Sequence, residues 1–387
     1  MPTEPMPFPR SPRIAGGEVF AFRLPMRTTF RTSRGVVGGE QSGRTVVLVK
    51  LTADDGQSGW GEASPVVTWS PETVASVGGA LRDHFLPAVQ GLPVADLDGL
   101  HRAMDAAVAP LWGLSLPIAR AGIDIAAHDL LARSLDVPLW TLLGSRRRDQ
   151  VQLSWTVTGA TPASVEASIR EGQERGYRSA NIKLGGTPAW DVELCRLVRR
   201  LLPDGYLWGD ANGGWPIHEG PARAQALEAA GLDLLEQPFA PDRAAACAAL
   251  LPRLHVPLAL DEPVTGPAVV SELLAGCCLS ALALKVTRTG GLLPSRRCAD
   301  MAEAAGLLLV SSGLTDAGVG FAANVQLAAA YGVSRPCALN GPQFLGDDIL
   351  ATPLPQDGDI VRVPERPGLG IEVDEAKVRR LAEHAPC

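Results

Sequence analysis

The chain has 387 residues, of which 46% are hydrophobic and 20% are charged, and its formal net charge is −7. This length and composition are typical of a globular protein with one large or two moderate domains. The acidic balance argues against nucleic acid as a partner, because phosphate binding needs a basic surface. The dense basic run Arg146-Arg147-Arg148 is interpreted as a solvated face.

No stretch approaches the ~18 consecutive apolar residues of a membrane helix. The N-terminal MPTEPMPFPRSPR has no apolar segment like that of a signal peptide, so we expect a frayed leader and a cytoplasmic protein with no membrane partner. The seven cysteines are odd in number and include no CxxC spacing. That pattern indicates reduced and mostly buried thiols.

The N-terminal third begins with strand patterns and continues with helical ones. Three short apolar runs predict strands, at 19–22, 45–50 and near 59–62. A polar, glycine-bearing stretch, 27–39, separates the first two runs and predicts a loop. Apolar residues at helical spacing follow, most clearly in 116–135. A sheet followed by helices predicts an α+β unit over residues 1–135.

From residue 136 onward, short apolar runs alternate with alanine-rich helical segments. The eight runs are 151–157, 179–185, 206–212, 232–239, 257–263, 281–288, 307–313 and 337–341. This alternation predicts α/β architecture with parallel strands, and eight units favour a (β/α) barrel over 136–350. An open doubly wound sheet is the alternative, although its usual GxGxxG motif is absent. The tail, 351–387, is interpreted as an extended return to the first unit.

Five consecutive runs end in a charged residue. These residues are Lys183, Asp210, Glu236, Asp261 and Lys285, and they lie 24 to 27 residues apart. One strand–helix unit therefore separates each charge from the next. Because the C-terminal ends of barrel strands face one mouth, we expect the five side chains to converge there.

The three acids in this series predict a metal site. Carboxylates that meet in one mouth repel one another and lose solvation, so they need a compensating charge. Ligands that are all oxygen favour Mg²⁺, or Mn²⁺, over zinc. Asp210, Glu236 and Asp261 are therefore predicted metal ligands, and three separate salt bridges at strand ends are the alternative.

The two lysines predict acid–base chemistry. In a closed ring, the strands that carry Lys183 and Lys285 lie across from each other, so the amines approach a substrate from opposite sides. Nearby cationic charge favours the neutral amine that a general base needs. We interpret Lys183 as the base that removes a proton from carbon, with the metal stabilising the resulting enediolate. Taken alone, Lys183 is better explained as a side chain that snorkels to solvent.

At these residues the chain resembles the enolase superfamily, in its muconate-lactonizing-enzyme subgroup. The matching motifs are Asp210-Ala211-Asn212, Glu236-Gln237-Pro238, Asp261-Glu262 and Lys285 followed by Gly290-Gly291. The resemblance covers nearly the whole chain. It implies a modified TIM barrel, (β/α)₇β, with an α+β capping domain, Asn212 and Glu262 beside the metal ligands, and a small-molecule carboxylate as substrate. We also expect a homo-oligomer.

The chain differs from the usual family motifs at several catalytic positions. No histidine lies between His255 and His384, so the resemblance implies a lysine base rather than a histidine base. The family usually has Lys-x-Lys on the second barrel strand, where this chain has Asn181 in place of the first lysine. The glutamate usual at the seventh strand end is also missing, and Asp316 stands nearest to that position.

The resemblance also suggests where substrate selectivity lies. Family members close the site with capping-domain loops, which here are 23–36 and the segment after Glu62. Arg31, Arg34 and Trp69 of these loops are candidate substrate contacts. Asn340 stands where dipeptide epimerases usually carry Asp-x-Asp, which disfavours that activity. The run 339–343 is similar to hydroxyproline dehydratase and proline-betaine epimerase relatives.

Together these patterns predict a Mg²⁺-dependent enzyme that removes the α-proton of a small carboxylate. Racemisation or epimerisation, and dehydration, are equally compatible outcomes, with an amino acid or proline derivative among the candidate substrates. Lys285 is interpreted as the acid, as the opposite-face base or as an electrostatic stabiliser. Three alternatives remain: cycloisomerisation of the muconate type, ligand binding without catalysis, and a metal-independent barrel in which Lys183 forms a Schiff base.

Overall fold

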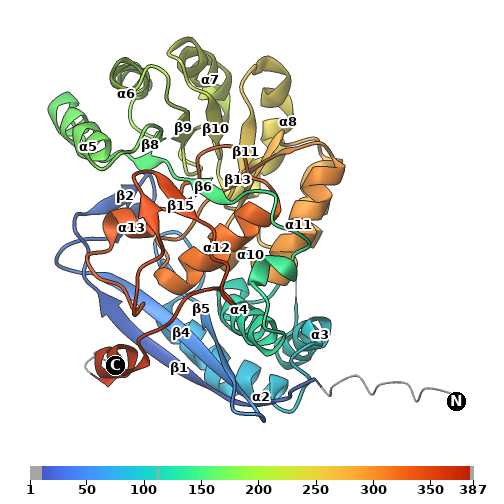
Figure 1. The fold of residues 1–387 in the computed structure, drawn as a ribbon. Helices are drawn as coiled ribbons and strands as arrows, with labels where there is room; N and C mark the ends of the chain where they lie inside the picture. Colours follow the sequence, from blue (N-terminus) through green and yellow to red (C-terminus); the bar gives the residue numbers. More distant parts are fainter. Residues whose placement is uncertain (1–10, 111–112, 384–387) are drawn as a thin grey trace, which may run out of the picture.

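The structure is a computed structural model that describes residues 11–110 and 113–383. Most of the expected frayed leader, as well as Cys387, lies outside the described residues. Figure 1 shows a capping domain, built on a sheet near the N-terminus, packed against the mouth and one side of a barrel. The modified TIM barrel with a capping domain predicted from the sequence is confirmed.

The capping domain is built on an antiparallel sheet. Its strands, in the order β1-β4-β5, are β1 (Ile14–Leu24), β4 (Arg44–Ala53) and β5 (Ser58–Glu62). Where the sequence predicted only a loop, a small hairpin forms from β2 (Phe30–Thr32) and β3 (Gly35–Gly38). Its turn passes through Gly35 at φ 132°, a conformation that favours glycine. We call β2 and β3 the closing hairpin.

The helices of the capping domain cover one face of this sheet. They are α1 (Val74–Gly79), the π-helical turn η1 (Ala80–Phe85), α2 (Leu86–Val89), α3 (Leu97–Ala107) and α4 (Pro117–Ser134). Helix α4 packs directly against β5 at Gly61. A Cβ added to Gly61 would stand 2.0 Å from the carbonyl oxygen of Gly122, which is too close for any side chain. Glycine at Gly61 therefore allows a nearly fully buried helix to pack against the strand.

Seven parallel strands form the barrel sheet, in chain order. They are β7 (Trp155–Thr156), β8 (Ala180–Lys183), β9 (Leu207–Asp210), β10 (Leu234–Glu236), β11 (Leu258–Leu260), β12 (Ala281–Leu284) and β13 (Leu308–Ser311). The eighth run expected from the sequence, 337–341, forms two parallel bridges instead of a strand. Cys337 pairs with Leu153 and Ala338 pairs with Ser312, so the bridges join the two ends of the sheet.

Helices and turns separate the barrel strands, as the alternating pattern predicted. The helices are α5 (Pro162–Glu174), α6 (Pro188–Leu201), α7 (Gly220–Ala229), α8 (Cys247–Leu250), α9 (Pro267–Ala275), α10 (Val286–Thr289), α11 (Leu292–Ala304), α12 (Gly318–Ala330) and α13 (Gly341–Phe344). The 3₁₀ turns are η2 (Leu139–Thr141), η3 (Ile217–Glu219), η4 (Pro241–Ala246) and η5 (Leu251–Arg253). A buried apolar cluster that includes Trp208, Leu234 and Val310 fills the barrel interior. Since side chains alternate along a strand, Asp210 points to the same side as Trp208, one layer nearer the mouth.

The C-terminal segment returns to the capping domain. Strands β14 (Gln356–Asp357) and β15 (Ile360–Arg362) extend β6 (Gln150–Gln152). Leu369 N then donates to Asp129 of α4 at 2.7 Å, and the last helix, α14 (Glu375–Glu383), lies beside β1. An ion pair of 2.7 Å between Lys50 and Glu375 ties α14 to the sheet.

In the ranges 11–110 and 113–383, no helix combines the length and apolarity required to cross a membrane. The six described cysteines are all free thiols. Cys277 is exposed, and the others are buried.

A buried carboxylate joins the capping domain to the barrel. Asp124 of α4 contacts His101 Nε2 at 2.7 Å and His128 Nδ1 at 3.2 Å, and it also accepts hydrogen bonds from the first amides of α11, Leu292 and Leu293. Burial would raise the pKa of Asp124, but the charge of His128 and hydrogen bonds from both histidines lower it below its usual range. Burial would likewise lower the pKa of His128, and Asp124 reverses this and raises it.

This cluster predicts a pH-dependent stability. A histidine whose pKa is raised on folding stabilises the protein fully below its unfolded pKa of about 6.5, and the contribution is lost as pH rises through the folded pKa. We expect the free energy of unfolding to fall from about pH 6 towards alkaline pH, and to fall less in His128→Gln. Urea unfolding of both proteins across this range measures the difference. Parallel curves would contradict the assignment.

Candidate active site

The five charged side chains predicted at the barrel mouth lie at the ends of β8 to β12, and four of them form two ion pairs. Lys183, Asp210 and Glu236 stand side by side, because Lys183 pairs in register with Asp210 and Asp210 with Glu236. Lys183 Nζ lies 2.6 Å from Asp210 Oδ2. Lys285 forms an ion pair with Asp261. All three carboxylates are buried.

The carboxylates lack sufficient positive charge and hydrogen-bond donors. Burial raises the pKa of Glu236 well above its usual range, and the charges of Asp210 and Asp261 raise it further, against the opposing effect of the two lysines. Glu236 Oε1 and Asp261 Oδ1 are buried without a hydrogen-bond partner. Buried carboxylate oxygens of this kind need a donor or a cation, and a set made only of carboxylate oxygens suits Mg²⁺.

The three acids are not, however, in the geometry of a preformed metal site. Among the residues that the structure describes, no three His, Cys, Asp or Glu side chains stand as a group that could hold a metal ion. Each lysine instead bonds one of the acids directly. A metal ion bound by these carboxylates would therefore displace the lysine ammonium groups that now contact them.

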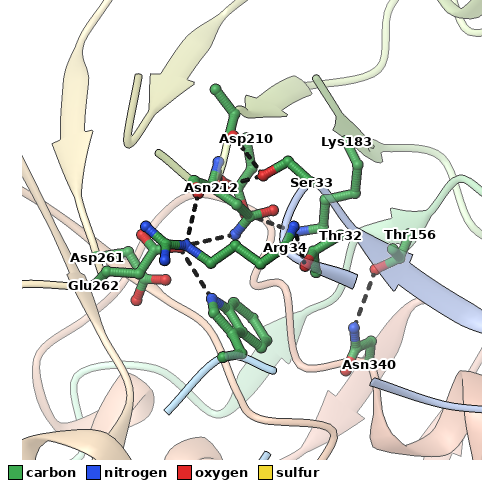
Figure 2. Close-up of polar contacts among 12 residues, drawn as sticks. Thr32, Ser33, Arg34, Thr156, Lys183, Asp210, Asn212, Asp261, Glu262 and Asn340 are labelled. Carbon is green, nitrogen blue, oxygen red and sulfur yellow. Dashed lines mark hydrogen bonds and ion pairs between the residues drawn. The ribbon is translucent and has the colours of Figure 1, made fainter. Parts of the chain in front are cut away.

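Asn212 and Glu262 lie beside the acids, as the family pattern implied. Asn212 N donates to Asp210 Oδ1 at 2.8 Å, and its Nδ2 donates to Glu262 Oε1 at 3.1 Å (Figure 2). Trp69 of the capping domain donates its indole N–H to the same Glu262 oxygen at 3.0 Å. Burial, followed by the charges of Asp261 and Asp210, raises the pKa of Glu262.

Trp69 covers the cationic side of the site. Its ring centroid lies 4.1 Å from Lys285 Nζ and 4.8 Å from Arg288 Cζ. Arg288, which was not among the predicted site residues, pairs with Asp261 at 2.8 Å and is buried. Its position three residues after Lys285, on one helical face, is the signal that could have indicated it. Lys285 is left only 2% exposed.

Three further predicted residues occupy the barrel without joining the acid cluster. Asn340 accepts a hydrogen bond from Thr315 at 3.1 Å. Asp316 accepts bonds from Thr287 Oγ1 at 3.2 Å and Leu314 N at 3.1 Å. Asn181 lies below Lys183 on β8, 1% exposed, and both polar atoms of its amide are buried without a hydrogen-bond partner. Its short side chain is thus enclosed where the family usually places a lysine.

The loop arginines behave differently from each other. Arg34 Nε donates to the carbonyl oxygen of Asn212 at 3.0 Å, so its guanidinium is engaged by the barrel. Arg31, on the same closing hairpin, is exposed and lines a cavity of about 370 Å³ beside Lys183. The other walls of the cavity are the segments 157–160 and 184–186 and the ring of Trp190. Lys183 is therefore the lysine that faces an open space.

Two family descriptions match the chain. Residues 18–144 match "Mandelate racemase / muconate lactonizing enzyme, N-terminal domain", and residues 164–377 match "Enolase C-terminal domain-like". The chain belongs to the mandelate racemase/muconate lactonizing enzyme family. Within the enolase superfamily it falls in the muconate-lactonizing-enzyme subgroup, as predicted.

Members of the family resemble the chain over nearly its full length. The N-succinylamino acid racemase of Thermus thermophilus is 32% identical, with 95% of this chain and 97% of that protein covered. An o-succinylbenzoate synthase of Geobacillus stearothermophilus is 30% identical, with 94% of each chain covered. The 2-chloromuconate cycloisomerase of Rhodococcus opacus 1CP superposes with a TM-score of 0.88 at 27% identity, covering 96% of this chain and 99% of that one. The chain is accordingly an enzyme of the isomerase or lyase class.

The buried charge of Glu236 leads to a prediction about metal removal. We expect Glu236→Gln to raise the unfolding temperature of the metal-free protein by roughly 2 °C or more, because it removes a buried carboxyl whose ionised form is repelled by two others. We also expect Mg²⁺ to stabilise the wild type and to lose that effect in the variant. Thermal unfolding with EDTA and with Mg²⁺ tests both expectations. A destabilised metal-free variant would show that Glu236 is held by partners other than a metal.

Proposed function

We propose that the protein catalyses Mg²⁺-dependent racemisation or epimerisation at the α-carbon of a small carboxylate. The observation that carries the proposal is the row of Lys183, Asp210 and Glu236 at neighbouring strand ends, with Lys183 facing the cavity. An amine beside a cluster of metal-type ligands is the arrangement needed to take a proton from a carbon next to a carboxylate.

Asp210, Glu236 and Asp261 would hold the ion, and Mn²⁺ has the same ligand preference. When bound, the ion would attract the substrate carboxylate and stabilise the negative charge that develops as the α-proton leaves. Burial lowers the pKa of Lys183, but the charges of Asp210 and Glu236 raise it overall. Lys183 Nζ would therefore take the α-proton as a neutral amine once the ion has displaced it from Asp210. Lys285, approaching from the other side of the mouth, returns a proton to the opposite face. Trp69 covers Lys285 and Arg288, which keeps water from these charges.

The substrate that we propose is an N-succinylated amino acid. The relative with 32% identity is named for that substrate class. Such a molecule has no free ammonium, which fits the neutral Asn340 where an ammonium-binding family member usually has acids. Its succinyl group carries a second carboxylate, and Arg31 on the wall of the cavity provides a cation for it.

Cycloisomerisation is the second candidate, and the burial of Lys285 favours it. Only Lys183 of the two lysines lines the cavity, and Lys285 lies beneath Trp69. A reaction that needs one amine, such as ring opening of a lactone or loss of a β-substituent in a dehydration, can proceed with Lys183 alone. Racemisation needs both amines, so the lysine variants separate the candidates.

The decisive measurement is α-deuterium incorporation in D₂O with Mg²⁺. We expect exchange with N-succinyl amino acids of both configurations in the wild type. Lys183→Ala should lower exchange from one configuration by about 10²-fold or more, and Lys285→Ala from the other. Loss in Lys183→Ala alone, with Lys285→Ala active on both enantiomers, would reject a two-base racemase.

Control substrates and conditions complete this experiment. Muconate and 3-hydroxy acids report cycloisomerisation and dehydration, and removal of Mg²⁺ with EDTA should abolish each activity. Trapping with borohydride and a carbonyl substrate should leave Lys183 unmodified, because no Schiff base is proposed. Unchanged exchange in both lysine variants would show that other groups move the proton.

A further inference from the structure

The backbone of Asn212 connects the closing hairpin to the acid cluster. Its N–H donates to Asp210 Oδ1 at 2.8 Å. Its carbonyl oxygen accepts from Arg34 Nε at 3.0 Å and from Ser33 Oγ at 3.3 Å, and Ser33 Oγ also reaches the carbonyl oxygen of Ala211 at 3.0 Å. Figure 2 shows Arg34 and Ser33 directed at this turn, next to Asp210. The peptide unit between Ala211 and Asn212 thus bonds Ser33 through its carbonyl oxygen and a predicted metal ligand through its N–H, while Arg34 holds the next peptide unit through the carbonyl oxygen of Asn212.

The turn after Asp210 has an unusual backbone. Asn212 has φ 45° and Gly213 has φ 71°, both in the left-handed region. Such conformations persist where the surroundings hold them. The hairpin packs tightly on the turn, because a Cβ on Gly213 would lie 3.0 Å from Arg34 Nη2 and one on Gly214 would lie 3.2 Å from Ser33 Cβ. The direction of the Asn212 N–H therefore depends on the hairpin.

A second contact from the capping domain reaches the same residue through a carboxylate. Glu262 Oε1 accepts from Asn212 Nδ2 and from the Trp69 indole. Both hydrogen-bonding ends of Asn212, its carbonyl and its side chain, are thereby connected to the capping domain. Asn212 itself is fully buried, so water does not replace these bonds while the domains are packed.

We propose that Arg34 is a positioning residue that couples closure of the hairpin to metal binding, acting through Asn212 on Asp210. With the hairpin closed, the Asn212 N–H holds Asp210 Oδ1 in place. Asp210 Oδ2, which contacts Lys183, is then the oxygen that would bind the ion in place of the lysine. Since coupling between two equilibria is reciprocal, bound Mg²⁺ favours the closed hairpin to the same degree. This inference rests on the proposed metal site, and it gives Arg34 a role in addition to the substrate contact predicted from the sequence.

The chain offers a matched pair of variants. Arg34 and Arg31 are on the same hairpin and have the same charge, but Arg34 bonds the turn, whereas Arg31 lines the cavity. In calorimetric titrations of Mg²⁺ without substrate, we expect Arg34→Ala to weaken binding about 5-fold or more. Arg31→Ala should bind Mg²⁺ like the wild type. Ser33→Ala, which removes the other bonds to the turn, should weaken binding in the same direction as Arg34→Ala.

A second measurement separates coupling from a general loss of structure. Hydrogen exchange of the amides in 30–38 should slow when Mg²⁺ is added to the wild type and to Arg31→Ala, and should not respond in Arg34→Ala. Equal unfolding temperatures without Mg²⁺ would confirm that the variants are folded. Wild-type affinity in Arg34→Ala, or unchanged hairpin exchange on adding Mg²⁺ to the wild type, would overturn the coupling. Absence of Mg²⁺ binding by the wild type would instead refute the proposed metal site.

Discussion

Repulsion among three buried carboxylates is the constraint on which the rest of this molecule depends. Neighbouring parallel strands end at or just before these acids, which are Asp210, Glu236 and Asp261. Because the C-terminal ends of barrel strands lie at one mouth, the three carboxylates face each other there. Burial and mutual repulsion raise the pKa of Glu236, and three nearby cations contact the other two acids. Lys183 bonds Asp210, and both Lys285 and Arg288 bond Asp261. The surrounding structure is thus arranged to hold a concentrated negative charge.

The barrel and its acid cluster were predictable because their signal is local and repeated. Each strand is a short apolar run followed by one charge, and parallel topology brings the ends of such runs together. The closing hairpin gave a weaker signal, since its strands have three and four residues. Arg288 was missed for a different reason. Its spacing from Lys285 was the available local signal, and no local pattern records its contact with Trp69, which is distant in the chain.

The capping domain completes the site through a few long-range contacts. Trp69 supplies an aromatic face to three cations, Lys183, Lys285 and Arg288, and an N–H to Glu262. Arg34 supplies a donor to the turn after Asp210. Both residues were predicted to contact substrate, which stays a prediction, and in the structure they also contact the barrel. The sequence shows that a capping loop carries an arginine or a tryptophan. Only the packing of the two domains shows which barrel residues that side chain contacts.

The closure of the barrel is uneven. Four register pairs join β8 to β9 and four join β12 to β13, whereas the ring is completed by single bridges at Cys337 and Ala338. The segment that ends in Asn340 is therefore the seam of the barrel, held by the fewest backbone bonds, while the metal-type ligands lie on the continuous sheet. Side chains along this seam can change in size and polarity without moving the acids. The fold thereby separates a continuous sheet, which carries the acids and lysines, from an edge closed by single bridges, where altered side chains can change substrate preference.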